Sequence, residues 1–276
     1  MANLLMANLH FTKMHGLGND FVVVAANDTD ALPTAKLWRA LADRRTGIGF
    51  DQALVILPPR QADATAYYRI FNADGGEVEQ CGNGVRCVAE WLRMQGRATA
   101  PLLKLDSSGG RVEAAFVAAG MVAVNMGVPR FASTGESMLQ VDGEEVLFTE
   151  VSMGNPHIVL RVPSVEEAPV GTLGARLESH QRFPQRTNVG FLQVIDPAHA
   201  RLRVFERSVG ETKACGTGAC AAMASARRQG LLAAEAEISL PGGALQLRWQ
   251  GEGSNLWMTG PATVAFRGEV DLSQFA

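Results

Sequence analysis

The second half of the chain repeats the first. Residues 69–96 align without a gap to residues 203–230, and ten of the 28 aligned positions are identical. Each copy holds one cysteine at the same aligned position, Cys81 or Cys215, followed by the pattern Gly-x-Gly. The repeat offset of roughly 135 residues is too long for a solenoid unit, so it predicts two domains of one fold facing each other across a pseudo-twofold axis.

We place these domains at residues 1–125 and 126–276, and the last dozen or so residues can cross back to the first domain. A helix is expected directly after each cysteine, because apolar residues recur there with helical spacing. Gly96 stands where a C-terminal glycine cap belongs. The positions with this spacing are Val85, Val88, Ala89 and Leu92 in the first copy and Ala219, Ala222, Met223 and Ala226 in the second.

The position of the two cysteines suggests proton chemistry. A helix N-terminus stabilises a thiolate, so we expect the pKa of each thiol to be lowered towards neutrality. The glycines that follow let backbone N–H groups approach an anion such as a carboxylate. Two such helix ends in the cleft between the domains would remove a proton from one face of a carbon and deliver one to the other. The predicted outcome is inversion of a stereocentre without a cofactor.

Composition limits the other classes of function. The chain has 276 residues, a net charge of −3 and a pI near 6.0, which argues against a nucleic-acid or membrane-surface partner. No apolar run approaches the roughly 18 residues that span a bilayer, and the N-terminus does not resemble a secretory signal. Four cysteines are too few for a disulfide scaffold, so we expect a reducing cytoplasm.

Other readings of the cysteines stay open. Cys87 and Cys220 do not occupy equivalent repeat positions, and they are expected to be buried core residues without a chemical role. A zinc site is disfavoured because the cysteine spacings are wide and no histidine cluster accompanies them, so no metal is expected. The glycines do not form a dinucleotide fingerprint. A redox pair of Cys81 and Cys215, or a non-catalytic binding or redox-sensing protein, remains a rival.

The polar residues of the glycine-rich turns are candidates for binding an amino acid. Glu206 could take an ammonium group, and Arg207 could bind a second carboxylate bidentately. His157 is placed in a turn, after a Gly-Asn-Pro sequence. The asparagines near turns and strand ends are Asn19, Asn72, Asn155 and Asn188.

Over nearly its whole length the chain resembles the diaminopimelate epimerase family. The matching stretches are MHGLGNDFVVV, GIGFDQ, RIFNADGGEVEQCGNGVRC, VSMGNPH, LESHQRFPQRTNVGF, ERSVGETKACGTGACAA and LPGG. The resemblance implies an α+β fold of two domains, each a mostly antiparallel barrel-like sheet around a central helix. It also implies interconversion of LL- and meso-diaminopimelate, in lysine and peptidoglycan precursor biosynthesis, without pyridoxal phosphate or metal.

The resemblance also assigns roles to residues. Cys81 and Cys215 would be the acid/base pair, while Glu206 and His157 would contact the reacting amino group and support proton transfer. The reacting carboxylate would be bound by Gly82, Asn83, Gly216 and Thr217, and the rest of the substrate by Asn19, Gln52, Asn72, Asn155, Asn188 and Arg207. A homodimer is implied, although Phe266 stands where some members have tyrosine. A racemase of similar fold acting on proline, hydroxyproline or another amino acid is the alternative enzyme.

Overall fold

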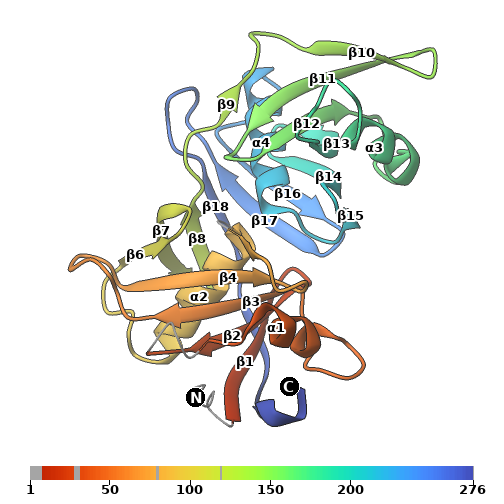
Figure 1. Ribbon diagram of the computed structural model, residues 1–276. Coiled ribbons are helices and arrows are strands. Elements are labelled where there is room, and N and C mark those ends of the chain that lie inside the picture. Colours follow the sequence, from red (N-terminus) through yellow and green to blue (C-terminus); the bar gives the residue numbers. More distant parts are fainter. Residues whose placement is uncertain (1–7, 28–31, 79–80, 119, 276) are drawn as a thin grey trace. The chain divides into compact units, whose positions relative to one another are not determined.

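The computed structural model describes residues 8–27, 32–78, 81–118 and 120–275. The chain forms two compact units, which divide between Val124 and Asn125 and again between Gly260 and Pro261. We call them the N-terminal unit, which includes the C-terminal segment from Pro261, and the C-terminal unit. Figure 1 shows each as strands around a helix. In the described part of the chain, no helix has the length and apolarity needed to cross a membrane.

The N-terminal unit is one sheet in the order β19-β1-β2-β3-β4-β6-β7-β8, with β5 also paired to β4. The β2–β3 and β4–β6 pairs are parallel and the others antiparallel. Its elements are β1 (Asn8–Gly16), β2 (Asn19–Ala25), α1 (Ala35–Ala42), β3 (Gln52–Leu57), β4 (Ala66–Asn72), β5 (Glu77–Val78), α2 (Gly82–Met94), β6 (Leu102–Ser107), β7 (Gly110–Ala118), β8 (Met121–Asn125), β19 (Thr263–Asp271) and the 3-10 helix η2 (Leu272–Phe275).

The C-terminal unit repeats this topology in the order β11-β12-β13-β14-β16-β17-β18, with β15 paired to β14. Its parallel pairs, β12–β13 and β14–β16, stand at the same places. The internal duplication is therefore a repeat of structure. The elements are β9 (Arg130–Phe131), β10 (Ser137–Val141), β11 (Glu144–Ser152), β12 (Pro156–Arg161), α3 (Val170–Glu178), β13 (Asn188–Asp196), β14 (His199–Glu206), β15 (Gly210–Thr212), α4 (Gly216–Arg228), β16 (Glu235–Leu240), β17 (Gly243–Arg248) and β18 (Trp257–Pro261).

Helices α2 and α4 are the central helices of their units. Helix α2 contacts β1, β2, β3 and β7, and α4 contacts β11, β12, β13, β14, β16 and β17. The helical spacing in the sequence predicts one apolar face, but ten consecutive residues of α2, including Arg86 and Glu90, are buried. A helix enclosed by its own sheet is buried on all sides, so even its polar positions lose contact with water.

A second helix packs on the opposite face of each sheet. Helix α1 begins at its N-cap Thr34, whose side chain accepts a hydrogen bond from the Leu37 N–H. Its Trp38 is fully buried and stacks on Phe71 of β4, with ring centroids 5.5 Å apart. Helix α3 packs in the same way on β13 and β14. Figure 1 shows α1 and α2 on either side of the N-terminal strands.

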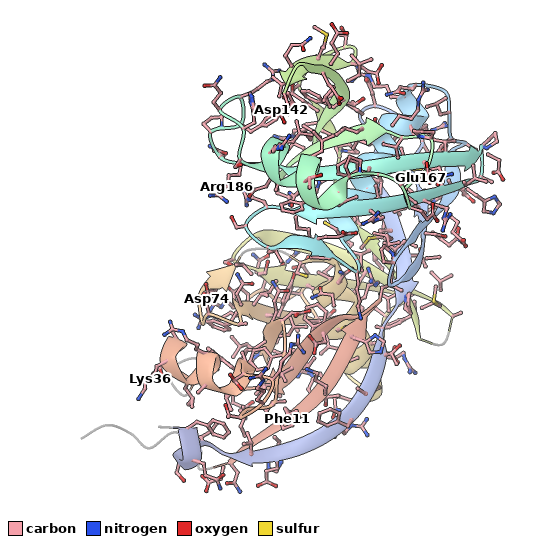
Figure 2. The ribbon with its side chains drawn as sticks, turned by 90° about the vertical axis from the view of Figure 1, so that its right-hand side faces the viewer. Phe11, Lys36, Asp74, Asp142, Glu167 and Arg186 are labelled. Carbon is pink, nitrogen blue, oxygen red and sulfur yellow. The ribbon has the colours of Figure 1, made fainter. Side chains whose placement is uncertain are left out.

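The C-terminal segment belongs to the N-terminal unit. Strand β19 runs antiparallel to β1 from Asn8 opposite Asp271 to His15 opposite Thr263. Phe266 of β19 meets the ring of Phe11, which Figure 2 labels on β1, edge to face at 5.9 Å. The last residue of the core cluster around Trp38 is Leu272 of η2. This segment therefore completes the sheet that holds α1.

Candidate active site

Cys81 is the N-cap residue of α2, as the sequence predicts. Its carbonyl accepts the first helical hydrogen bond, from the Val85 N–H at 3.0 Å, so the N–H groups of Gly82, Asn83 and Gly84 precede the helical ladder. A Cβ at Gly84 would lie 3.1 Å from Leu54 Cδ2 and 3.5 Å from the Cys81 Cβ. Glycine at this position therefore lets the helix start close to β3. Glu79 and Gln80, in the same repeat copy, lie outside the described residues.

Amide side chains surround the Cys81 end of α2. Asn19 Oδ1 accepts from Asn83 Nδ2 at 3.2 Å and lies 3.8 Å from Cys81 Sγ, within hydrogen-bond reach for sulfur. Gln52 and Asn72 face each other across β3 and β4, and Gln52 Nε2 donates to Asn72 Oδ1 at 2.8 Å. Gln52 Oε1 is buried and has no hydrogen-bond partner among the described residues. A buried acceptor without a partner is costly, and a bound ligand with an N–H group would satisfy it.

Cys215 holds the equivalent position at the start of α4. Its side chain is almost completely buried. Glycine is again sterically favoured three residues after the cysteine. A Cβ at Gly218 would lie 3.0 Å from Val204 Cγ2 and 3.2 Å from Cys215 Sγ. Both sequence copies therefore place a thiol at the N-terminus of a buried helix.

The polar partners of Cys215 differ from those of Cys81. Thr217 Oγ1 lies 3.7 Å from Cys215 Sγ, and Asn155 Nδ2 donates to that hydroxyl at 3.4 Å. Asn155 Oδ1 lies 2.9 Å from His157 Nε2. Glu206, at the end of β14, accepts from the Thr212 hydroxyl and also interacts directly with the Cys215 thiol.

Burial raises the pKa of Cys215 well above its ordinary value, and the negative charge of Glu206 adds to this effect. Hydrogen bonds from the Gly218 N–H and Thr217 oppose the shift without reversing it. The expectation that the helix end lowers this pKa is therefore wrong for Cys215 without substrate. Desolvation and a neighbouring carboxylate outweigh the helix dipole, whose effect is worth only about 0.3–2 kcal/mol.

His157 is a strand residue, which corrects its expected place in a turn. It is the second residue of β12, opposite Asn188 of β13, and is buried. Burial, reinforced by the positive charge of Arg207, lowers the pKa of His157 to about 3. Its imidazole is therefore neutral at physiological pH and can orient Asn155, but it does not carry a charge.

The turn after β14 holds Arg207. Its N–H donates to Asn188 Oδ1 at 3.0 Å, and Asn188 Nδ2 donates to the Pro156 carbonyl at 2.9 Å. The next residue, Ser208, has φ +62°, and its N–H donates to buried Glu178 Oε1 at 2.9 Å. Arg186, which Figure 2 shows at the edge of the C-terminal unit, also donates to Glu178, at 3.1 Å.

The remaining cysteines are buried inside the helices. Cys87 and Cys220 are both fully inaccessible, and all four cysteines are free thiols. Burial raises the pKa of Cys87 to about 12. Across the described ranges, no three His, Cys, Asp or Glu side chains are grouped to hold a metal ion.

Within the N-terminal unit, the structure brings together Asn19, Gln52, Asn72, Cys81, Gly82 and Asn83, at the ends of β2, β3 and β4 and the start of α2. Within the C-terminal unit, it brings together Asn155, His157, Asn188, Glu206, Arg207, Cys215, Gly216 and Thr217. Sequence reasoning missed Asp51 and Glu178, which hold these groups in place. The available signal was weak: both are acidic residues inside the motifs GIGFDQ and LESHQRFPQRTNVGF.

The fold, with one thiol at the N-terminus of each central helix, defines a class of duplicated α+β proteins. A hydroxyproline epimerase from Agrobacterium vitis superposes with a TM-score of 0.73 over 96% of this chain and 92% of that chain, at 16% identity. A PhzF-family protein of Bacillus anthracis superposes with a TM-score of 0.71 over 96% and 99%, at 17% identity. At these identities the likeness concerns the fold alone, and it confirms the predicted fold class.

The sequence comparisons are more specific. The family model for diaminopimelate epimerase matches residues 11–132 and 149–265. A diaminopimelate epimerase of Stutzerimonas stutzeri (strain A1501) is 50% identical over 96% of this chain and 99% of its own length. That of Pseudomonas aeruginosa (strain LESB58) is 49% identical over the same shares. The chain belongs to the diaminopimelate epimerase family, as its sequence motifs indicate.

Proposed function

We propose that this chain is an isomerase that converts LL-2,6-diaminopimelate to meso-2,6-diaminopimelate, with Cys81 and Cys215 as its two acid/base groups. The observation that carries the proposal is the thiol at the N-terminus of each central helix, followed by glycine and by N–H groups that precede the helical ladder. Relatives named diaminopimelate epimerase are about half identical to the chain over nearly its full length, whereas the hydroxyproline epimerase shares only 16%. This difference favours diaminopimelate over proline or hydroxyproline.

In the proposed reaction, a thiolate removes the proton from the α-carbon, and the electron pair of the C–H bond moves into the adjacent carboxylate. The second thiol gives its proton to the opposite face of the carbon and becomes the thiolate. The reaction inverts the centre and needs no external oxidant or reductant. The mechanism requires that both thiols reach one carbon from opposite faces.

The backbone N–H groups at the helix starts suit the charge that develops on the carboxylate. Gly82 and Asn83 in one unit and Gly216 and Thr217 in the other carry N–H groups that precede the helical ladder. Donors aimed at developing negative charge commonly contribute about 2.7–4 kcal/mol each to the transition state. We propose that these four residues bind the reacting carboxylate.

We propose that Glu206 and His157 support proton transfer at Cys215. Glu206 interacts with the Cys215 thiol and is the acidic group that could receive its proton. Neutral His157 bonds Asn155, which in turn bonds Thr217 beside the thiol. Glu206 is also suitably charged to contact the substrate ammonium group.

The rest of the substrate has matching partners. The unpartnered Gln52 Oε1 can accept from an ammonium group, and Arg207 can bind a carboxylate. We propose that they bind the substrate with Asn19, Asn72, Asn155 and Asn188.

The substrate assignment is tested by comparing turnover of LL-diaminopimelate, meso-diaminopimelate, L-proline and trans-4-hydroxy-L-proline under the same conditions. We expect the two diaminopimelate isomers to interconvert and the two cyclic amino acids to remain unchanged. Turnover of proline with no reaction of diaminopimelate would contradict the assignment.

We further propose that the protein works in the cytoplasm as a homodimer. Four free thiols suit a reducing compartment. Phe266 is half exposed on β19, where it offers an apolar contact to a second copy. Analytical ultracentrifugation should give twice the chain mass of 29.5 kDa; a monomer at the concentration of an activity assay would contradict the dimer.

A further inference from the structure

The Asn19 side chain lies between Cys81 and a cluster of charged residues. Asn19 Oδ1 lies 3.8 Å from Cys81 Sγ, and Asn19 Nδ2 donates to Asp51 Oδ2 at 2.9 Å. Asp51 is the residue directly before β3, and it does not contact Cys81 in any of these bonds. Its effect on the thiol would therefore pass through the Asn19 amide.

The carboxylate determines which end of the amide faces the thiol. A carboxylate only accepts hydrogen bonds, and the NH₂ end of an asparagine only donates them. The NH₂ of Asn19 must therefore face Asp51, which turns Oδ1 towards Cys81. Asn83 supports the same orientation, because its Nδ2 donates to Asn19 Oδ1 at 3.2 Å.

Asp51 is itself held from several directions. Its Oδ1 accepts from Arg44 Nη2 at 2.7 Å, and its Oδ2 accepts from the Asp20 N–H at 3.0 Å. The Asp51 N–H in turn donates to Asp20 Oδ1 at 3.0 Å. Arg44 makes two bonds to Asp20, at 2.8 and 2.9 Å, and Lys13 lies 2.5 Å from the same carboxylate. Burial opposes ionisation of Asp20, but hydrogen bonds from Arg44 and Lys13 hold its pKa far below the usual range.

In the C-terminal unit the equivalent asparagine, Asn155, has the opposite amide orientation relative to its cysteine. Asn155 stands before β12 as Asn19 starts β2, but its Oδ1 faces His157 and its Nδ2 faces Thr217, the hydroxyl beside Cys215. The residue before β13, at the place of Asp51, is Thr187. Of the two thiols at the helix starts, Cys81 faces the acceptor end of its asparagine, whereas the equivalent asparagine turns its donor end towards the hydroxyl beside Cys215.

We propose that Asp51 is a positioning residue, which fixes the Asn19 amide so that the Cys81 thiol faces an acceptor and is held in its protonated form. An acceptor stabilises S–H and disfavours S⁻. Cys81 is then the proton donor of the free protein, and this role rests on the proposed function. The orientation itself does not depend on the substrate.

Other groups also act on the Cys81 thiol. Tyr68 of β4 and Cys87 of α2 interact with it electrostatically. Short chains of hydrogen bonds through Asn19 connect it to Asn83 and Arg86 on one side and to Asp51, Arg44, Asp20 and Lys13 on the other. Two described side chains bond the Asn19 amide: Asn83 donates to its Oδ1, and Asp51 accepts from its NH₂ end. An Asp51 variant therefore removes the acceptor that fixes the NH₂ end, while Asn83, Tyr68 and α2 stay in place.

The test is the pH dependence of iodoacetamide alkylation at Cys81 and Cys215, followed separately by peptide mass spectrometry. In Asp51→Ala the NH₂ end of Asn19 loses its acceptor, and only the 3.2 Å bond from Asn83 still holds Oδ1 in place. The amide can then turn its NH₂ towards sulfur more readily, so the Cys81 midpoint should move to lower pH. Alkylation at pH 7 should become faster by about 2- to 10-fold, the size of one neutral hydrogen bond. Cys215 should be unchanged. Asp63→Ala is the matched control, because Asp63 also pairs with an arginine of this unit, Arg111, away from Cys81.

A double-mutant cycle tests whether the effect of Asp51 on Cys81 passes through the Asn19 amide. Asn19→Ala should also lower the Cys81 midpoint, and Asp51→Ala added to it should cause no further shift. Asp51→Asn, whose amide keeps only one acceptor oxygen, is a shape-preserving second variant with a smaller shift in the same direction. An unchanged Cys81 midpoint in folded Asp51→Ala, Asp51→Asn or Asn19→Ala would overturn the proposal. Alkylation needs no turnover, so failure to epimerise diaminopimelate would refute the proposed function and leave this result interpretable.

Discussion

At the scale of single residues, the two thiols have similar backbone positions and different surroundings. Cys81 faces the neutral Asn19 amide, whereas Cys215 is buried beside the Glu206 carboxylate. The repeat aligns Asn72 with Glu206, so a neutral amide in one copy corresponds to a negative charge in the other. The duplication therefore supplies two helix ends, and the local side chains make them chemically unequal.

Removing the charge of Glu206 should change the Cys215 thiol. In Glu206→Gln the raised pKa of Cys215 should fall, because a neutral amide no longer repels the thiolate. Alkylation of Cys215 at pH 7 should then be faster, while kcat for diaminopimelate falls. Glu211→Gln, which removes an exposed carboxylate paired with Arg203, is the control and should change neither quantity. Slower alkylation of Cys215 in Glu206→Gln would contradict this electrostatic account.

Each catalytic thiol should be indispensable. Cys81→Ala or Cys215→Ala should lower kcat by on the order of 10²–10⁴-fold, the range for a positioned acid or base. Cys220→Ala, which removes a buried thiol inside the same helix as Cys215, should keep nearly full activity per folded molecule. Steady-state kinetics measure the loss of catalysis, and circular dichroism shows whether each variant is folded. Retained inversion in either of the first two variants would argue for a binding or redox-sensing role of the thiols.

At the scale of elements, Glu178 connects the end of α3 to the turn that carries Arg207. In Glu178→Ala the Ser208 N–H loses its acceptor, and the turn with φ +62° becomes less constrained. We expect KM for diaminopimelate to rise by about fivefold, for about 1 kcal/mol of lost binding, with a smaller change in kcat. Glu150→Ala, which removes a carboxylate bonded to Arg182 in the same unit, should leave KM unchanged. A loss confined to kcat would exclude a role through substrate binding.

The turn between β4 and β5 packs tightly on α1. Gly75 has φ +83°, and a Cβ there would lie 2.3 Å from the Ala35 carbonyl oxygen. Gly75→Ala should therefore lower the free energy of unfolding by more than the about 1–2 kcal/mol of a left-handed alanine alone. Gly120→Ala is the control, since Gly120 has φ +71° and no described atom within 4 Å of the added Cβ. Equal losses for the two variants in urea unfolding would show that the close approach to α1 costs nothing.

Local sequence signals predict where a helix or strand forms, but they do not predict which other parts of the chain surround it. The helix after each cysteine and the glycine cap at Gly96, with φ +68°, are confirmed, and Gly230 takes the same conformation, with φ +74°, after the second helix. Apolar spacing could not show that α2 is enclosed, because burial of Arg86 depends on strands distant in sequence. The pairing of Asn19 with Asp51 was likewise invisible, since the parallel β2–β3 pair brings together residues 32 positions apart.

At the scale of the whole molecule, duplication explains both the fold and the presence of a thiol at the start of each central helix. Each unit repeats the same order of parallel and antiparallel strands around one buried helix. The motifs predicted the family and the candidate residues, and the sequence comparisons confirm the family. The polar connections did not follow from the repeat, because positions such as Asn83 and Thr217 align but form different hydrogen bonds.

The central claim is that two different thiols act on the two faces of one carbon. Turnover of LL-diaminopimelate in D₂O, stopped early and analysed by mass spectrometry after separation of the isomers, tests it most directly. A thiol that delivers a solvent-derived deuteron to the opposite face should label the inverted meso product at one α-carbon. The unreacted LL substrate should stay unlabelled. Equal early labelling of both isomers would show that one group removes and returns the proton on the same face, and would contradict the two-thiol mechanism.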